Sequence, residues 1–145
     1  TVFNHDNQTL ILTDKKTPAN GSKVINSVKD VQDMLSAFYF LRSQNELKIG
    51  SKKNLSVWID DEMFPFQLKI EGVEDVKTKY GTISCLKVIP LVQSGRVFKE
   101  KEGVTLWVSN DKNFVPISIK AELAVGSLKA DISGYKNLKY TLNFK

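Results

Sequence analysis

Hydrophobic and polar residues alternate along most of the chain. The clearest run covers residues 115–123, where one face carries Val115, Ile117, Ile119, Ala121 and Leu123. Successive side chains of a β-strand point to opposite faces, so this period predicts a strand. Similar runs at 54–59 and 63–73 flank a short acidic turn, which predicts an antiparallel hairpin. Turn-forming residues separate such runs throughout the chain, and we expect about eight or nine strands.

The period changes once, in residues 30–43. There the apolar residues follow the i, i+3, i+4, i+7 spacing of a helix, at Val31, Met34, Leu35, Phe38 and Leu41. The spacing predicts one α-helix over about residues 30–43, with Ser27 or Asp30 as its N-cap. Its broad apolar stripe indicates that it packs across a sheet.

These elements predict a mainly β fold: an antiparallel, strongly curved sheet or half-open barrel with one packed α-helix. The chain has 145 residues and shows no repeat or linker, so we expect a single domain over residues 1–145. No stretch reaches the roughly 20 apolar residues that a membrane-spanning helix needs.

The charged residues argue against a nucleic-acid partner. The net charge of +5 comes from 21 basic and 16 acidic residues, and only Arg42 and Arg96 are arginines. Arginine is the usual reader of bases and clamp of phosphates, and the lysines are dispersed, so we expect no nucleic-acid partner. Mild attraction to an anionic membrane surface, as a peripheral contact, stays open.

Few residues suit catalysis. His5 is the only histidine and Cys85 the only cysteine, so neither a nucleophile–base pair nor a Cys/His metal site can be assembled. Cys85 lies in the apolar run "TISCLKVIP" and is expected to be a buried small residue. Asp111 in "SNDKN" is explained by an Asx turn. The sequence therefore predicts a noncatalytic protein without a metal or cofactor.

Aromatic residues suggest a binding role. The candidate ligand-binding residues are Phe38, Arg42, Trp58, Phe66 and Trp107. The aromatic side chains either line a groove for an amphiphile or belong to the core. Arg42 either stabilises the end of the helix as a cation or anchors an anionic headgroup. In the first hypothesis the helix covers an apolar groove in the concave face.

The alternative is a structural or protein-interaction module without a small ligand, which docks by strand edges or hairpin tips. In that case the concavity is filled by inward side chains, for which the candidates are Val115, Ile117, Ile119, Leu128 and Ile132.

Three motifs occur in order along the chain: "DMLSAFYFLRS", "EGVEDVKTKYGTISCLKVIP" and "VTLWVSNDKNFVPISIKAELAVGSLKADI". Together they resemble DUF3108, a family of unknown function found in exported proteins of Gram-negative bacteria, over about residues 30–132. The resemblance implies a mainly β half-barrel in the periplasm or cell envelope. The two functional hypotheses give a lipid or an envelope protein as the expected partner. It supplies no catalytic residues.

The family resemblance and a second, looser one each add an expectation. Family members have more strands before the helix than residues 1–29 provide, which favours an open barrel and a chain that is part of a longer mature protein. The stretch "LWVSNDKNFVPISIKAEL" also resembles one hairpin of lipoprotein carriers, whose half-barrels hold acyl chains against a concave face.

Overall fold

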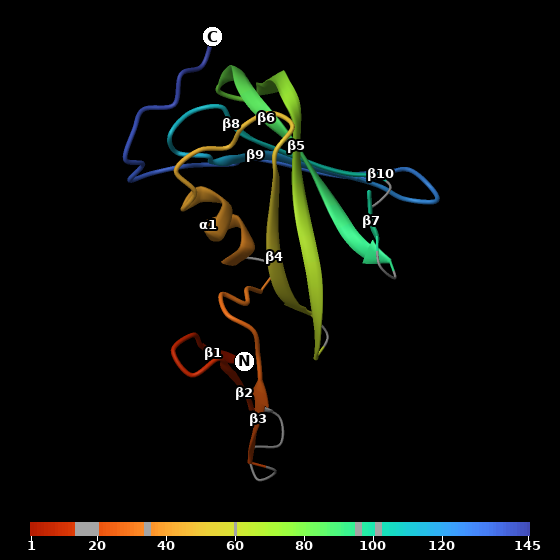
Figure 1. The fold of residues 1–145 in the computed structure, drawn as a ribbon. Coiled ribbons are helices and arrows are strands. Elements are labelled where there is room, and N and C mark those ends of the chain that lie inside the picture. The colour runs from red at the N-terminus through yellow and green to blue at the C-terminus, as the bar shows by residue number, and fades with distance from the viewer. Residues whose placement is uncertain (14–20, 34–35, 60, 95–96, 101–102) are drawn as a thin grey trace.

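The computed structural model describes residues 1–13, 21–33, 36–59, 61–94, 97–100 and 103–145. The predicted mainly β fold class is confirmed: the described residues form two antiparallel sheets and one short helix. Figure 1 shows the smaller sheet at one end of the molecule and the C-terminus near the other end. Ten strands lie in the described residues, slightly more than predicted, because the first is too short to show an alternating pattern.

The N-terminal sheet has three strands in the order β1-β2-β3. They are β1 (Val2–Asn4), β2 (Thr9–Thr13) and β3 (Ser22–Asn26). The side chain of Leu10 at the centre of this sheet is fully buried and packs in a cluster with Val31 and Trp58. Since Trp58 belongs to the large sheet, this cluster joins the two sheets.

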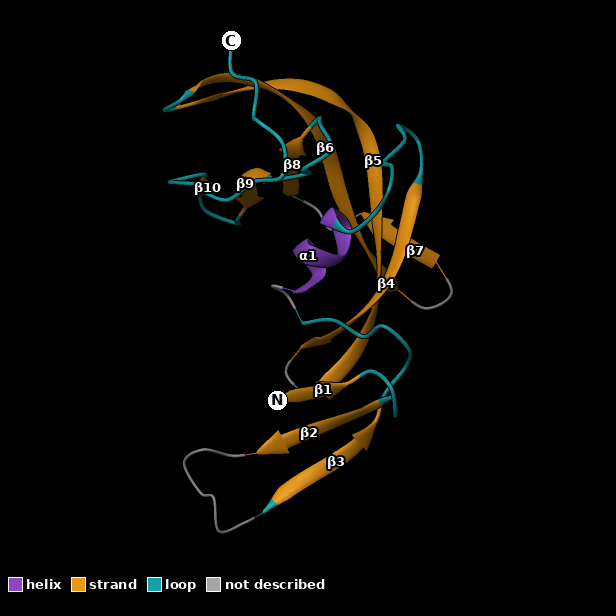
Figure 2. Ribbon diagram, turned by 90° about the vertical axis from the view of Figure 1, so that its left-hand side faces the viewer, coloured by secondary structure: helices purple, strands orange, loops and turns teal. Residues whose placement is uncertain are grey.

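The large sheet has seven strands in the order β10-β9-β8-β6-β5-β4, and β7 pairs with β6. Its strands are β4 (Lys52–Ile59), β5 (Glu62–Thr78), β6 (Gly81–Ser94), β7 (Val97–Glu100), β8 (Val104–Ser109), β9 (Pro116–Glu122) and β10 (Ser127–Asp131). The sheet is not closed, and Figure 2 shows it curving around the helix. The register shifts between Ile70 and Gly72 and between Trp107 and Val108, and such bulges bend a strand and increase its twist.

The helix α1 (Ser36–Arg42) is shorter than predicted. Asp33 caps it: the backbone N–H of Ser36 donates to Asp33 Oδ1 at 2.7 Å. The predicted N-caps Ser27 and Asp30 were therefore wrong. Gln32, which was predicted to be helical, forms a β-bridge with the edge of β4. The backbone N–H of Trp58 donates to the carbonyl of Gln32 at 2.7 Å. The predicted helical residues Met34 and Leu35 lie outside the described residues.

Each face of the large sheet carries a hydrophobic cluster. The inner cluster lies on the helix side and contains Leu41, Leu47, Ile70, Leu86, Val88, Leu106, Val108 and Phe114. The outer cluster contains Ile83, Cys85, Val115, Ile117 and Leu142. Because successive residues of a strand face opposite sides, Cys85 and Leu86 belong to different clusters.

The C-terminal segment, residues 132–145, covers the outer cluster. Leu138 and Phe144 pack against it, and Leu142 is part of it. The segment is fastened at its end, because Thr82 and Lys145 exchange backbone hydrogen bonds of 3.2 and 2.7 Å. No helix in the described part of the chain has the length and hydropathy needed to cross a bilayer.

Candidate ligand-binding pocket

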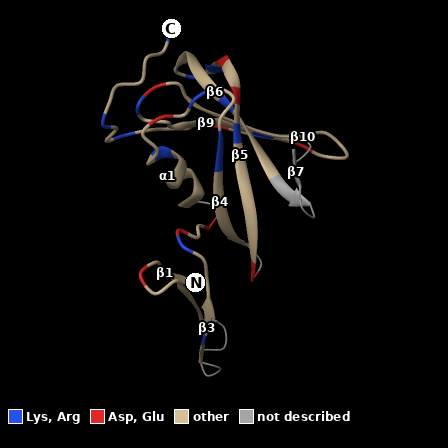
Figure 3. Cartoon of the chain, viewed as in Figure 1, with Lys and Arg blue, Asp and Glu red and all other residues tan. Residues whose placement is uncertain are grey.

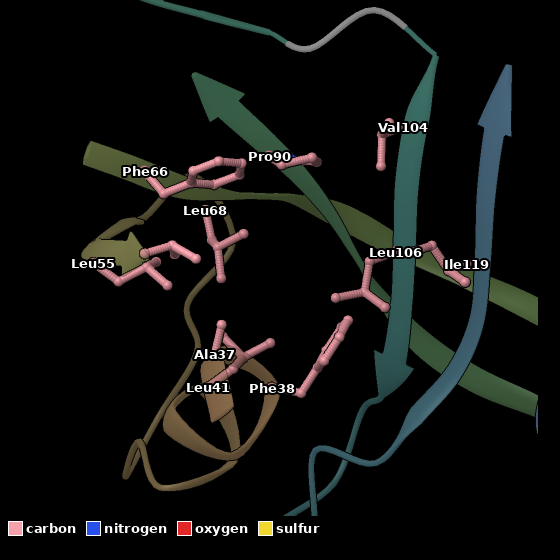
Figure 4. A pocket seen from close by; sticks show the side chains of 11 residues that line it. Ala37, Phe38, Leu41, Leu55, Phe66, Leu68, Pro90, Val104, Leu106 and Ile119 are labelled. Atoms are coloured by element: carbon pink, nitrogen blue, oxygen red, sulfur yellow. The ribbon is translucent and has the colours of Figure 1, made fainter. Parts of the chain in front are cut away.

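An apolar pocket of about 110 Å³ lies between α1 and the inner face of the large sheet. Every residue that lines it is apolar: Ala37, Phe38, Leu41, Leu55, Val57, Phe66, Leu68, Pro90, Val104, Leu106 and Ile119. They come from the helix and from five strands, β4, β5, β6, β8 and β9. Figure 4 shows the helix residues facing the side chains of the strands across this space.

Phe38 stands at the border of the pocket. In Figure 4 its ring lies between α1 and the side chains of Leu106 and Ile119. It also lines two more open hollows, of about 220 and 300 Å³. The first of these is bordered by Tyr39, Arg42 and Pro116, and the second follows β9 and β10. Phe38 is therefore a wall residue that the apolar pocket shares with both neighbouring hollows.

Arg42 is the positive charge beside this border. It is the last residue of α1, and its Nε donates to the backbone carbonyl of Asn113 at 3.1 Å. Its guanidinium carbon lies 5.8 Å from the ring centre of the exposed Tyr39. The two terminal nitrogens of Arg42 make no hydrogen bond or ion pair with the described residues. The position of Arg42 fits both roles considered from the sequence. Arg42 lies at the C-terminal end of the helix, and its terminal nitrogens can donate hydrogen bonds to an anion.

Only part of the predicted set meets at this pocket. Phe38 and Phe66 line it, and Arg42 lies next to it. Trp58 is buried between the two sheets with Leu10 and Val31, so it belongs to the core. Trp107 lies on the outer face, packed against the outer cluster. Neither tryptophan reaches the pocket.

Trp107 takes part in a polar network on the outer face. Its indole N–H donates to Glu74 Oε2 at 2.8 Å. Lys87 bridges Glu71 and Glu74, with an N–O distance of 3.1 Å to each. The hydrogen bond from Trp107 is the main cause that lowers the pKa of Glu74, and the bond from Lys87 is the main cause that lowers the pKa of Glu71. These contacts stabilise the outer face and lie apart from the pocket.

Of the pocket residues, Ile119 was predicted to point into the concavity, and it does line the pocket. The sequence did not single out Val104 and Leu106, which continue the alternation of β8, or Ala37, which is on the helical stripe. The pattern that placed Phe66 inward would also have found Leu68, two positions along the same strand. The predicted filling of the concavity was wrong in part, because Val115 and Ile117 belong to the outer cluster and Leu128 is 62% exposed.

The residues considered as candidates for catalysis, Cys85 and Asp111, have structural roles. Cys85 is fully buried as expected, and burial raises the pKa of its thiol to about 12. Asp111 accepts the backbone N–H of Asn113 at 2.8 Å, which confirms the Asx turn. Within the described ranges no three His, Cys, Asp or Glu side chains lie together in a way that could hold a metal ion.

The curved open sheet and the pocket under its helix define a class of small half-open β domains. A sequence model of the family DUF3108, described as "Protein of unknown function", matches residues 1–133. The chain belongs to this family, and the predicted resemblance is confirmed; the match also includes the N-terminal sheet. No curated protein and no solved structure matches the chain, so the likeness to lipoprotein carriers receives no support.

Proposed function

We propose that this protein is a noncatalytic binding module of the Gram-negative cell envelope, which holds the apolar tail of an amphiphile between α1 and the inner face of the large sheet. The observation that carries the proposal is the lining of the pocket, which contains no polar side chain. Ligand pockets are concave and mostly apolar, with few polar groups that fix orientation, and here Arg42 at the border supplies such a group.

The size of the pocket determines how a ligand would bind. A water molecule occupies about 30 Å³ of the liquid, so about 110 Å³ holds three or four groups of that size. Burying so few methylenes contributes about 3 kcal/mol, and association costs at least about 4 kcal/mol. The pocket behind Phe38 is therefore too small by itself to retain an acyl chain.

A tail that passes Phe38 removes this difficulty. The hollow along β9 and β10 offers further apolar surface on Pro116 and Ile119. About ten buried methylenes contribute about 8 kcal/mol, which exceeds the lower estimate of the association cost. Rotation of the Phe38 ring is the step that would join pocket and hollows. A headgroup next to Phe38 then lies within reach of Arg42.

The dye anilinonaphthalenesulfonate, which combines apolar rings with an anionic group, tests the site directly. Its fluorescence should rise on binding to the protein. Ala37→Leu adds three carbons to the pocket lining on a half-buried helical position and should weaken dye binding about tenfold or more. Ala124→Leu adds the same atoms at an exposed loop position and should bind as the unchanged protein does. Equal dye binding by both variants would contradict the proposed site.

The natural ligand can be sought by native mass spectrometry of protein purified gently from its own envelope. A stoichiometric adduct that yields a lipid after denaturation would support carriage of an amphiphile. Bare protein that also takes up no added lipid would favour a module without a small ligand.

One observation favours that second candidate function, a protein-interaction module. The hairpin that joins β9 and β10 ends in exposed apolar side chains: Leu123 is 58% exposed, Val125 91% and Leu128 62%. All residues of β10 are exposed at the sheet edge. A photo-cross-linker at Val125 should then give a discrete protein adduct in cells, whereas one at Val24, which is 64% exposed on the other sheet, should not.

The envelope location belongs to the proposal. It is tested by fractionating cells that express the complete natural gene product. Recovery with the periplasmic or membrane fraction would support it, and recovery with the cytoplasmic fraction would contradict it.

A further inference from the structure

Tyrosines and lysines gather at the end of the large sheet that holds the β5–β6 turn, the β8–β9 turn and the C-terminal segment. We call this surface the basic end, and define it by Lys77, Lys79, Tyr80, Lys112, Tyr135, Lys136, Lys139 and Tyr140. All eight residues are exposed. Hydrogen bonds join the three segments: Thr82 pairs with Lys145, and the N–H of Asn110 donates to the carbonyl of Ser84 at 3.0 Å.

The tyrosines of the basic end are held in place and remain accessible. The rings of Tyr80 and Tyr135 pack edge to face with centres 5.4 Å apart, and both also pack against Phe144. The hydroxyl of Tyr80 donates to the carbonyl of Ser133 at 2.9 Å. Even so, Tyr80 is 39% exposed, Tyr135 45% and Tyr140 40%. Large aromatic side chains are thus displayed on a fixed surface.

Lysines surround these rings. The ammonium nitrogens of Lys112 and Lys139 lie 5.7 and 5.5 Å from the ring centre of Tyr140, and that of Lys79 lies 5.1 Å from the ring centre of Tyr80. Residues 132–145 contain no acidic residue. Figure 3 shows lysine positions in blue along this segment.

Three acids of the adjoining strands and turns have partners outside the basic end. Asp111 accepts hydrogen bonds inside its own turn. Asp75 pairs with Lys145 at 3.2 Å. On the outer face, Glu74 is bound to Lys87 and Trp107. Among the described residues, no acid forms an ion pair with a lysine of the basic end.

We propose that the basic end is a docking surface for an anionic lipid membrane. Lysines near a bilayer are attracted to anionic headgroups, and tyrosine rings prefer the depth of those headgroups, so the two residue types together match a lipid surface. Protein interfaces are instead enriched in arginine, and the basic end as defined has lysines alone. A membrane fits this combination better than an acidic protein does.

The basic end is continuous with the border of the pocket. The side-chain amide of Asn113 donates to the carbonyl of Tyr140 at 2.8 Å and accepts its N–H at 3.1 Å, while the carbonyl of Asn113 accepts from Arg42. Docking by this end would place Arg42 near the headgroups. The docking surface stands on its own residues, so it does not depend on whether the pocket binds a ligand.

Vesicle co-sedimentation tests the proposal. The protein should sediment with vesicles made of equal parts phosphatidylglycerol and phosphatidylcholine, and not with vesicles of phosphatidylcholine alone. Raising the salt concentration should release it, because salt screens attraction between exposed charges over about 10 Å at 0.1 M. The double variant Lys136→Gln/Lys139→Gln should bind about 25-fold more weakly, since each lysine contributes roughly fivefold.

A matched control distinguishes binding by the basic end from an effect of the total charge of the protein. Lys23→Gln/Lys29→Gln removes the same charge from exposed positions near the N-terminal sheet and should leave vesicle binding within about twofold. Tyr135→Ser should also weaken binding, with an unchanged circular-dichroism spectrum. An equal loss of vesicle binding in the two double variants would contradict the proposed docking surface. Failure of the unchanged protein to bind the anionic vesicles would contradict it as well. Dye binding to the pocket is measured in parallel and should be unaffected by Lys136→Gln/Lys139→Gln.

Discussion

Arg42 at the end of α1 is bound through its Nε to the backbone carbonyl of Asn113, 71 residues further along the chain. This contact fixes the guanidinium beside Phe38 with its terminal nitrogens available to a ligand. Arg42→Gln should weaken binding of anilinonaphthalenesulfonate roughly tenfold, because a hydrogen bond to a charged group contributes about 1.5–3 kcal/mol. Fluorescence titration gives the affinity.

The neutral dye phenylnaphthylamine serves as control for this prediction. It should bind the Arg42→Gln variant almost as well as the unchanged protein, since it has no anionic group. Arg42→Lys keeps the charge and should retain most of the affinity for the anionic dye. If both dyes lose affinity equally in Arg42→Gln, Arg42 acts only by positioning the helix.

Asp111 organises the turn between β8 and β9. Its Oδ1 accepts the hydroxyl of Ser109 at 2.8 Å and the backbone N–H groups of Asn113 and Phe114 at 2.8 and 3.3 Å. Asp111→Ala leaves these donors without their acceptor and should lower the free energy of unfolding by about 2–3 kcal/mol. Asp111→Asn keeps an acceptor oxygen and should cost less. Urea denaturation measures the free energy of unfolding of both variants. An unchanged free energy of unfolding in Asp111→Ala would show that the turn does not depend on the carboxylate.

Gly81 has no room for a side chain. Its φ is +122°, and a Cβ would lie 2.9 Å from the carbonyl oxygen of Lys145. Gly81→Ala should therefore cost about 2 kcal/mol and loosen the C-terminal segment, which the near-ultraviolet signal of the tyrosines reports. At Gly134 a Cβ would meet nothing within 4 Å and φ is not positive, so Gly134→Ala should change stability by less than about 1 kcal/mol. Similar effects of both substitutions would contradict the close approach.

The network around Trp107 predicts a pH dependence. The pKa of Glu74 and that of Glu71 are lowered below 4.5, so their contribution to stability is complete above about pH 4.5 and is lost as the pH falls through the lowered values. The Glu74 side chain is 44% exposed, which keeps its share below about 1 kcal/mol. Trp107→Phe removes the main cause of the shift at Glu74.

Carboxyl resonances followed by NMR check this dependence. The pKa of Glu74 should rise in Trp107→Phe while that of Asp131, which is lowered mainly by Ser118, stays unchanged. The variant should also lose less stability than the unchanged protein between about pH 5 and pH 3. An unaltered pKa at Glu74 would mean that the indole hydrogen bond does not form in solution.

Alternation predicted the strands well because it reports a property of each strand alone. It placed Phe66 inward, and the helical period placed Phe38 on the stripe that faces the sheet. The start of α1 was predicted too early, because the apolar Val31 packs against Trp58 and Gln32 pairs with β4. That pairing depends on a partner strand that no local pattern reveals.

The tryptophans show why the site was harder to predict than the fold. A period of two separates the faces of a strand without saying which element covers each face. Trp107 faces Glu74 on the outer side, and Trp58 meets a second sheet formed by residues far away in the chain. Ile117 and Ile119 lie next to different clusters close to the register shift at Trp107, which also interrupts simple alternation.

The long hairpin of β5 and β6 has a consequence for the order of folding. Its strands are joined by a tight turn and pair from Thr78 and Gly81 as far as Phe66 and Val92, which is the longest pairing among the described strands. Contacts between residues near in sequence form with the smallest loss of loop entropy, so we expect the folding nucleus in this hairpin. One end of it carries Tyr80 and the other carries Phe66 and Pro90, so the nucleus would set the distance between basic end and pocket before the remaining strands join.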